Sequence, residues 1–172
     1  MANYDLRKSP GHLLRRAQQY AHDLHSSAVG ANGPTPRQFE VLHVVSRNKG
    51  ISQTDLVKAT GIDRSTLADM IARMLKKGLL SRSRDKEDAR ANNVSITPAG
   101  ARVLSGAASG VARADSATLG VLPKAQQAAF MKALGAYAAA LDLIAEGGAP
   151  KPARKTAKKK APAKKKAKRG RR

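Results

Sequence analysis

Residues 52–97 read SQTDLVKATGIDRSTLADMIARMLKKGLLSRSRDKEDARANNVSIT, and this stretch decides the fold. A short helical pattern is followed by a tight turn and by a longer amphipathic pattern at 63–77. Two alternating segments, 79–84 and 92–97, enclose a charged tip and predict a hairpin of two strands. This order predicts a winged helix-turn-helix, which places one helix in the major groove of DNA and a hairpin beside it.

Capping residues mark the ends of these helices. Ser52, with Asp55 three residues on, opens the short helix, and Asp63 opens the longer one. Gly78 ends the longer helix, because glycine accepts the left-handed backbone that closes many helices. Four more helices are predicted outside the stretch, over 9–27, 36–48, 98–118 and 123–146, and Thr97 caps the third of them. The inner sides predicted for the three central helices are Phe39, Leu42, His43 and Val45, then Leu56, Val57 and Ala59, then Leu67, Met70, Ile71, Met74 and Leu75.

The last predicted helix carries a regular apolar seam. Its large residues recur at steps of 4, 3, 4 and 3, at Phe130, Leu134, Tyr137, Leu141 and Ile144. This spacing keeps them on one side of a helix and is typical of a surface that packs against another helix.

The chain is strongly basic, with 33 Lys and Arg against 12 Asp and Glu and a net charge of +21. Residues 147–172 hold 13 of the basic residues and no acid, whereas residues 1–146 hold 20 basic and 12 acidic residues. Both parts predict a polyanionic partner. The charge alone does not distinguish nucleic acid from an anionic membrane as that partner. The composition of 147–172 predicts a segment that stays disordered until it meets a polyanion.

The sequence lacks the residues that several classes of function require. The chain has no Cys, which excludes disulfides, cysteine-based zinc sites and thiol redox sensing, and its few aromatic residues disfavour a base-stacking platform. No uninterrupted apolar run approaches the roughly 18 residues of a membrane span, so we expect a soluble, cytoplasmic protein with no membrane partner. No phosphate-binding glycine loop, nucleophile elbow or His-Glu metal motif is present, so we expect no enzyme activity, cofactor or metal.

The outward side of the 63–77 helix holds the first candidate DNA contacts. Arg64, Ser65 and Arg73 lie on this side, with Thr66 in the same first turn. Arg pairs with guanine and Ser with phosphates or base edges, whereas the alternative is an ordinary solvated helix face. Asp69 on the same side either accepts from a cytosine amino group or pairs with Arg73.

Two neighbouring segments supply further candidates for DNA contact. The short helix before the 63–77 helix opens with Ser52, Gln53 and Thr54, and these residues can anchor a phosphate. The alternative for Ser52 is that it only caps this helix. The hairpin is basic, and an Arg at such a wing can enter the minor groove. Asp88 shares a strand face with Arg90 and either orients it toward a phosphate or only balances charge. The hairpin candidates are Arg82, Arg84, Asp88 and Arg90.

His22 and His25 are spaced to share one helix face. A metal site would need further ligands that do not accompany them. The remaining interpretations are a small-molecule pocket or a pairing across subunits.

Residues 34–100 resemble the MarR family of bacterial transcription regulators. The similar segments are PTPRQFEVLHVV, ISQTDLVKATGIDRSTLADMIARMLKKGLLSR and RDKEDARANNVSITPAG, of which the Asp88-x-Arg90 pair and the closing ITPAG are the most specific. The flanking helices extend the resemblance to about residues 5–146. The segment 147–172 lies outside the family pattern and instead resembles the Lys/Ala/Pro tails of linker histones.

The resemblance implies a mainly α fold of the α+β type and a homodimer. It divides the chain into an N-terminal dimerisation helix and loop, a winged helix-turn-helix, C-terminal dimerisation helices and a basic tail, at 1–34, 35–97, 98–146 and 147–172. Members bind near-palindromic operators, usually as repressors, and a small phenolic or other anionic ligand releases them. The residues that the resemblance implies for the ligand pocket are Tyr20, His22, His25 and His43.

The leading hypothesis is therefore a sequence-specific, ligand-responsive repressor whose basic tail adds non-specific affinity for DNA. The alternative is an architectural protein of the bacterial nucleoid, in which the tail does most of the binding. A membrane-surface role for the tail is disfavoured, because no apolar anchor accompanies it.

Overall fold

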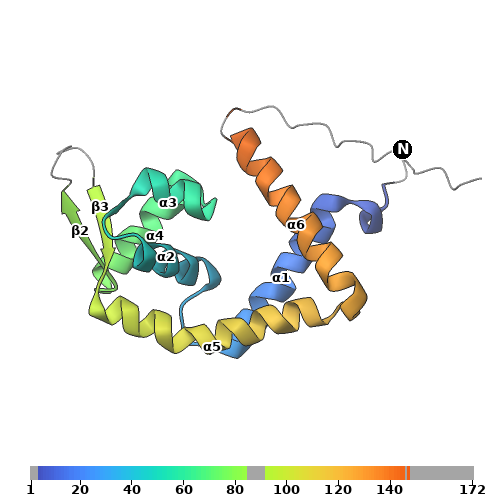
Figure 1. Cartoon of the computed structure of the whole chain (residues 1–172), viewed down its shortest axis with the longest axis horizontal. Coiled ribbons are helices and arrows are strands. Elements are labelled where there is room, and N and C mark those ends of the chain that lie inside the picture. Colours follow the sequence, from blue (N-terminus) through green and yellow to red (C-terminus); the bar gives the residue numbers. More distant parts are fainter. Residues whose placement is uncertain (1–3, 85–91, 146, 148–172) are drawn as a thin grey trace, which may run out of the picture.

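The computed structural model describes residues 4–84, 92–145 and 147. These form a mainly helical fold with a small antiparallel sheet (Figure 1), as the sequence predicts. After a short 3₁₀ turn at Leu6–Lys8, the helices are α1 (Pro10–Val29), α2 (Pro36–Arg47), α3 (Gln53–Thr60), α4 (Arg64–Lys76), α5 (Pro98–Gly120) and α6 (Lys124–Ala145). The strands are β1 (Ile51–Ser52), β2 (Leu80–Arg84) and β3 (Asn92–Ile96).

The sheet has three strands in the order β1-β3-β2, one strand more than the two that the sequence predicts for the wing. β2 and β3 form the expected hairpin, with Leu80 opposite Ile96 and Arg82 opposite Val94. β1 adds a pair on the other side of β3, where Ile51 lies opposite Val94. A strand of two residues is too short to show alternation, so the sequence pattern does not reveal it.

The predicted caps are present in the structure. Ser52, Asp63 and Thr97 each accept a hydrogen bond from a backbone N–H in the first turn of the helix that follows. Thr97 also donates from its hydroxyl to the carbonyl of Gly78 at 2.6 Å, which ties the start of α5 to the end of α4. Gly78 has φ of 68°, the left-handed conformation expected after a helix.

The core lies inside the winged domain. Two residues predicted to belong to it do not. His43 and Ala59 are exposed, whereas Val41 and Ile62 are buried. His43 lies outside because α2 turns Val41 and its neighbours inward, and the His43 ring stacks instead on half-buried Phe39, with centroids 6.2 Å apart. The buried apolar residues are Val41, Leu42, Val45, Leu56, Ile62, Leu67, Met70, Ile71, Met74, Leu80 and Val94.

α5 is a long helix that joins the winged domain to the rest of the chain, and α1 packs along it (Figure 1). The contact is close because Gly110 presents only backbone: a Cβ there would lie 2.7 Å from the carbonyl oxygen of Ala28. Arg113 donates from Nη2 to the same carbonyl at 3.2 Å. The end of α1 is thereby fixed against the middle of α5.

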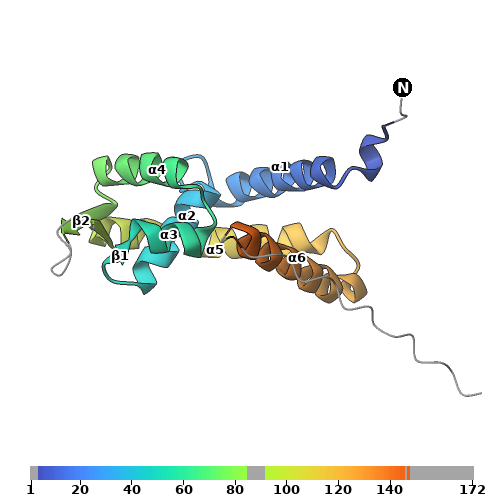
Figure 2. The same ribbon diagram turned by 90° about the horizontal axis from the view of Figure 1, so that it is seen from above.

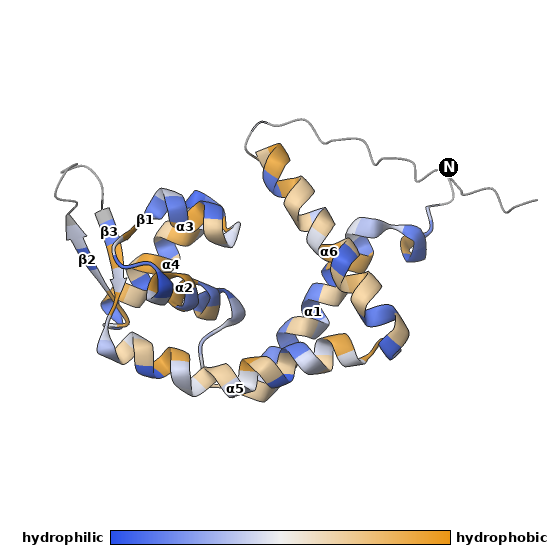
Figure 3. Cartoon of the chain, viewed as in Figure 1, coloured by the Kyte–Doolittle hydropathy of each residue, from blue (hydrophilic) through white to orange (hydrophobic). Residues whose placement is uncertain are grey.

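α6 is apolar but holds no buried residue among those described (Figure 3). The seam residues are all exposed, from Leu134 at 41% to Ile144 at 50%. Within the described residues, α6 is also the one helix long and apolar enough to cross a membrane by length and composition. Helices that pack on other helices share this length and composition, and α6 carries the charged residues Lys132 and Asp142.

Candidate DNA-binding surface and ligand cavity

α4 lies along one edge of the molecule (Figure 2), and the wing lies at the same end of the molecule (Figures 1 and 2). Its inner side is committed to the core through Leu67, Met70, Ile71 and Met74. The opposite side is open to solvent. The structure places Arg64, Ser65, Asp69, Arg73 and Lys76 there as exposed residues and leaves Thr66 half-buried.

Asp63 organises the first turn of α4. Its Oδ1 accepts from the backbone N–H of Thr66 at 2.9 Å and from the hydroxyl of Ser65 at 2.7 Å. The bonds from the backbone and side chain of Thr66, followed by the bond from Ser65, hold the pKa of Asp63 well below its usual range. The Ser65 hydroxyl proton is therefore already donated, and this oxygen is left to act as an acceptor.

The start of α3 shows a similar arrangement. Ser52 accepts from the backbone N–H of Asp55 at 3.1 Å and donates to the Asp55 carboxylate at 2.7 Å. Capping thus accounts for the Ser52 hydroxyl. Thr54 is exposed, whereas Gln53 is half-buried beside it.

The hairpin candidates are only partly described. Arg82 is exposed on β2, opposite Val94. Arg84 ends β2 in the register with Asn92. Asp88 and Arg90 lie outside the described residues, as does the segment 148–172.

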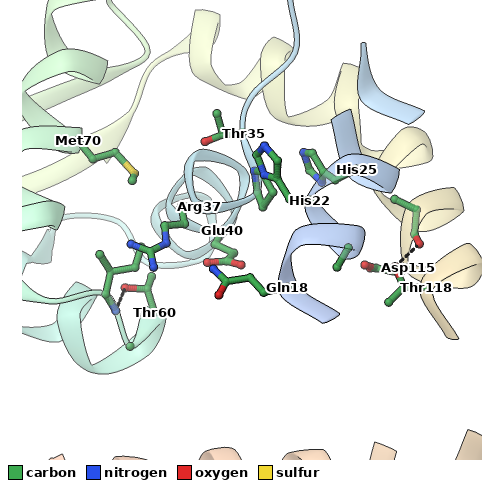
Figure 4. A pocket seen from close by; sticks show the side chains of 15 residues that line it. Gln18, His22, His25, Thr35, Arg37, Glu40, Thr60, Met70, Asp115 and Thr118 are labelled. Carbon is green, nitrogen blue, oxygen red and sulfur yellow. Dashed lines mark hydrogen bonds between the residues drawn. The ribbon is translucent and has the colours of Figure 1, made fainter. Parts of the chain in front are cut away.

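A cavity of about 640 Å³ lies where α1, α2 and α5 meet the turn between α3 and α4 (Figure 4). Of the candidate ligand residues, His22 and His25 line it, from α1. Tyr20 is 60% exposed and lies under the guanidinium of Arg16, 5.9 Å from the ring centroid, outside this lining. His43 lines a separate hollow of about 200 Å³.

His25 is held in one orientation. It is only 7% exposed, and its Nε2 lies 2.9 Å from the carbonyl oxygen of Pro34. A carbonyl only accepts, so Nε2 carries the proton and donates. His25 thus connects α1 to the loop before α2, at the wall of the cavity.

Three charged residues of this cavity are not marked by any motif in the sequence. Arg37 and Glu40 enter from α2 and Asp115 from α5, as Figure 4 shows. Partial burial raises the pKa of Glu40, against the lowering effect of the Arg37 and His25 charges. The i, i+3 spacing of Arg37 and Glu40 after Pro36 places both residues on one side of a helix, and this much is visible in the sequence. Only the tertiary fold brings them to His25. Within the described residues, no group of three or more His, Asp or Glu side chains is arranged to hold a metal.

The comparisons with known proteins agree with this geometry. Residues 32–91 match the family model described as the MarR family. The chain is 35% identical over 98 residues to the transcriptional regulator HosA of Escherichia coli, covering 57% of this chain and 73% of HosA. The chain belongs to the MarR family of transcriptional regulators.

Two solved structures extend the MarR likeness through the flanking helices. The PcaV regulator of Streptomyces coelicolor, in complex with its natural ligand, superposes with a TM-score of 0.74 at 33% identity, covering 82% of this chain and 99% of PcaV. BpsR of Bordetella bronchiseptica, whose DNA binding is regulated by 6-hydroxynicotinic acid, gives a TM-score of 0.74 at 30% identity, covering 80% of this chain and 98% of BpsR.

Proposed function

We propose that this MarR-family chain is a sequence-specific repressor that binds a near-palindromic operator as a homodimer and is released by a small ligand. The observation that carries the proposal is the exposed, polar and mostly basic side of α4, at the same end of the molecule as the basic wing. A helix so placed fits the major groove, while the wing follows the backbone.

The proposed contacts divide by chemistry. Arg64 and Arg73 are suited to base edges or phosphates on the exposed side of α4, with Ser65 and Thr66 in its first turn. The start of α3 is suited to a phosphate through Gln53 and Thr54, while Ser52 holds this helix end in place as its cap. The wing residues proposed to follow the DNA backbone and minor groove are Arg82, Arg84, Asp88 and Arg90.

The homodimer is proposed from apolar surface that one chain leaves uncovered. α6 exposes its whole seam, and α1 exposes Leu13, Leu14 and Tyr20. Exposed apolar area of this extent is unusual for a monomer and marks an interaction surface. A second copy covers it most simply, because a two-fold dimer also matches a near-palindromic operator.

The ligand is proposed to occupy the cavity between α1, α2 and α5. Arg37 offers a cation to a small carboxylate or phenolate, and His22 and His25 offer ring nitrogens. The reported action of 6-hydroxynicotinic acid on BpsR supports a ligand of this class. A ligand here contacts both the winged domain and the flanking helices, so it can favour one arrangement of the two.

The basic segment 147–172 is proposed to add non-specific affinity for DNA. Its 13 Lys and Arg residues would each steepen the salt dependence when they neutralise a phosphate. The same observation favours a second candidate function, an architectural nucleoid protein in which this segment supplies most of the binding.

The test is a selection of randomised duplexes by the full-length chain at physiological salt. Enrichment of one near-palindromic motif, bound about 1,000-fold or more above scrambled DNA, is expected for a specific regulator. Uniform recovery of all duplexes would favour the architectural function. Adding 6-hydroxynicotinic acid as a probe, with Arg37→Gln as the matched variant, then tests ligand release.

A further inference from the structure

Asp69 is the unexplained residue on the outward side of α4. It lies at the centre of the stripe Ser65, Asp69 and Arg73, which the i, i+4 spacing of a helix aligns on one side. The other charged residues of that side, Arg64, Arg73 and Lys76, are basic. A carboxylate facing phosphates is repelled, so its position at the centre of a DNA-binding surface needs a compensating partner.

No structural role in the described part of the chain uses this carboxylate. Asp69 is exposed, and no hydrogen bond or ion pair within the described residues engages it. By contrast, Asp63 caps α4, and the Asp55 carboxylate accepts from the hydroxyl of Ser52. The spacing to Arg73 would suit an ion pair, yet their charged atoms are not within 4.0 Å of each other. The alternative that Asp69 merely neutralises Arg73 is therefore not the arrangement in the structure.

The chemistry of the groove narrows the partner to one kind of base. A carboxylate only accepts hydrogen bonds. In the major groove guanine presents two acceptors, thymine an acceptor and a methyl group, and adenine an acceptor beside its amino group. Cytosine presents its N4 amino group without an acceptor of its own beside it, so cytosine suits an unpaired carboxylate best.

We propose that Asp69 is a specificity-determining residue that accepts a hydrogen bond from the N4 amino group of one cytosine in each half-site. The proposal rests on the proposed function, because it requires α4 to lie in the major groove. Asp69 then acts in two ways: it selects cytosine at one position, and it weakens binding to DNA that offers no amino group there.

The experiment compares motifs that full-length wild-type, Asp69→Asn and Asp69→Ala chains select from randomised duplexes. Asn pairs with adenine through its amide, so Asp69→Asn should shift one symmetric position from cytosine to adenine by about tenfold or more and leave the other positions unchanged. Asp69→Ala should lose the preference at that position and bind scrambled DNA more tightly than the wild type. Asp23→Asn removes the same charge from the exposed side of α1 and should leave the motif unchanged.

The outcomes separate the two proposals. A wild-type motif that both Asp69 variants reproduce would overturn the role of Asp69 and leave the proposed function standing. A wild-type chain that selects no motif would overturn both. Thermal unfolding of each variant accompanies the selection, because an exposed mid-helix residue without a partner in the described part of the chain should alter the midpoint little.

Discussion

A single carboxylate fixes the start of the helix proposed to enter DNA. Asp63 accepts from the Thr66 backbone and from the Ser65 hydroxyl, and these bonds favour its ionised form. Asp63 therefore has a structural role, whereas Asp69, six residues on, has no partner among the residues that the structure describes. We therefore expect substitution of Asp63 to change stability and substitution of Asp69 to change the choice of DNA sequence.

The stabilisation by Asp63 should depend on pH. Its folded-state pKa is lowered, so the stabilisation is present above the unfolded-state value of about 4 and is lost as the pH falls through the folded-state value. In thermal unfolding at neutral and at acidic pH, Asp63→Asn should melt below the wild type at neutral pH, and the gap should narrow in acid. A gap that stays constant with pH would show that the charge of Asp63 contributes nothing.

Caps of this kind are predictable from sequence because their partners lie within three residues. Ser52, Asp63 and Thr97 are confirmed as caps on that ground. The cavity residues Arg37, Glu40 and Asp115 are not predictable in the same way, since they come from two helices far apart in the sequence. No local pattern separates such residues from ordinary solvated charges.

At the scale of elements, the contact between α1 and α5 depends on the absence of side chains. The Gly110 backbone lies against the end of α1, whereas a Cβ on Gly106, one turn earlier, would meet nothing within 4 Å. Gly106 and Gly110, on the same helix, therefore form a matched pair of test positions.

Gly110→Ala should destabilise the protein by about 1–3 kcal/mol, because the added methyl group would press on the Ala28 carbonyl and force the helices apart. Gly106→Ala should instead stabilise by up to about 1 kcal/mol, because Ala is the better helix former. Chemical denaturation of both variants measures the two effects. Equal effects of the same sign would contradict the packing argument.

The helices were predictable as elements, since each is long enough to show period and caps. The strand β1 was not, because Ile51 and Ser52 form a strand only through pairing with β3. His43 and Ala59 show a related limit: α2 and α3 are short, and small rotations decide which of their positions reach the core.

At the scale of the molecule, the uncovered seam of α6 predicts the assembly. Leu134→Lys places a charge at the centre of the seam, and a dimer would bury one such charge from each subunit. Burial of each Leu contributes roughly 1.5–3 kcal/mol, so the wild type should sediment as a dimer and the variant mainly as a monomer. Lys132→Glu, on the opposite side of α6, should remain dimeric; a dimeric Leu134→Lys chain would place the interface elsewhere.

The basic segment predicts a change in salt dependence. Truncation after Gly147 removes no described helix, since α6 ends at Ala145. The shortened chain should bind its selected motif with a shallower log–log dependence on salt, by about 0.9 for each phosphate that the segment neutralises. Fluorescence anisotropy between low and physiological salt measures both slopes, and identical slopes would show that the segment does not contact DNA.

The unbroken course of α5 has a mechanical consequence. α5 begins directly after β3 of the wing, and Thr97 ties this start to the end of α4. The middle of α5 carries Gly110 against α1, and its second half lines the cavity at Asp115. A helix of this length is a stiff rod of about 34 Å. A tilt imposed near the cavity would therefore be delivered at the wing as a larger sideways displacement, as at the far end of a lever. In a dimer, the two α5 helices would set the distance between the two winged domains. A ligand of a few atoms would then need to move only the short part of each helix next to the cavity.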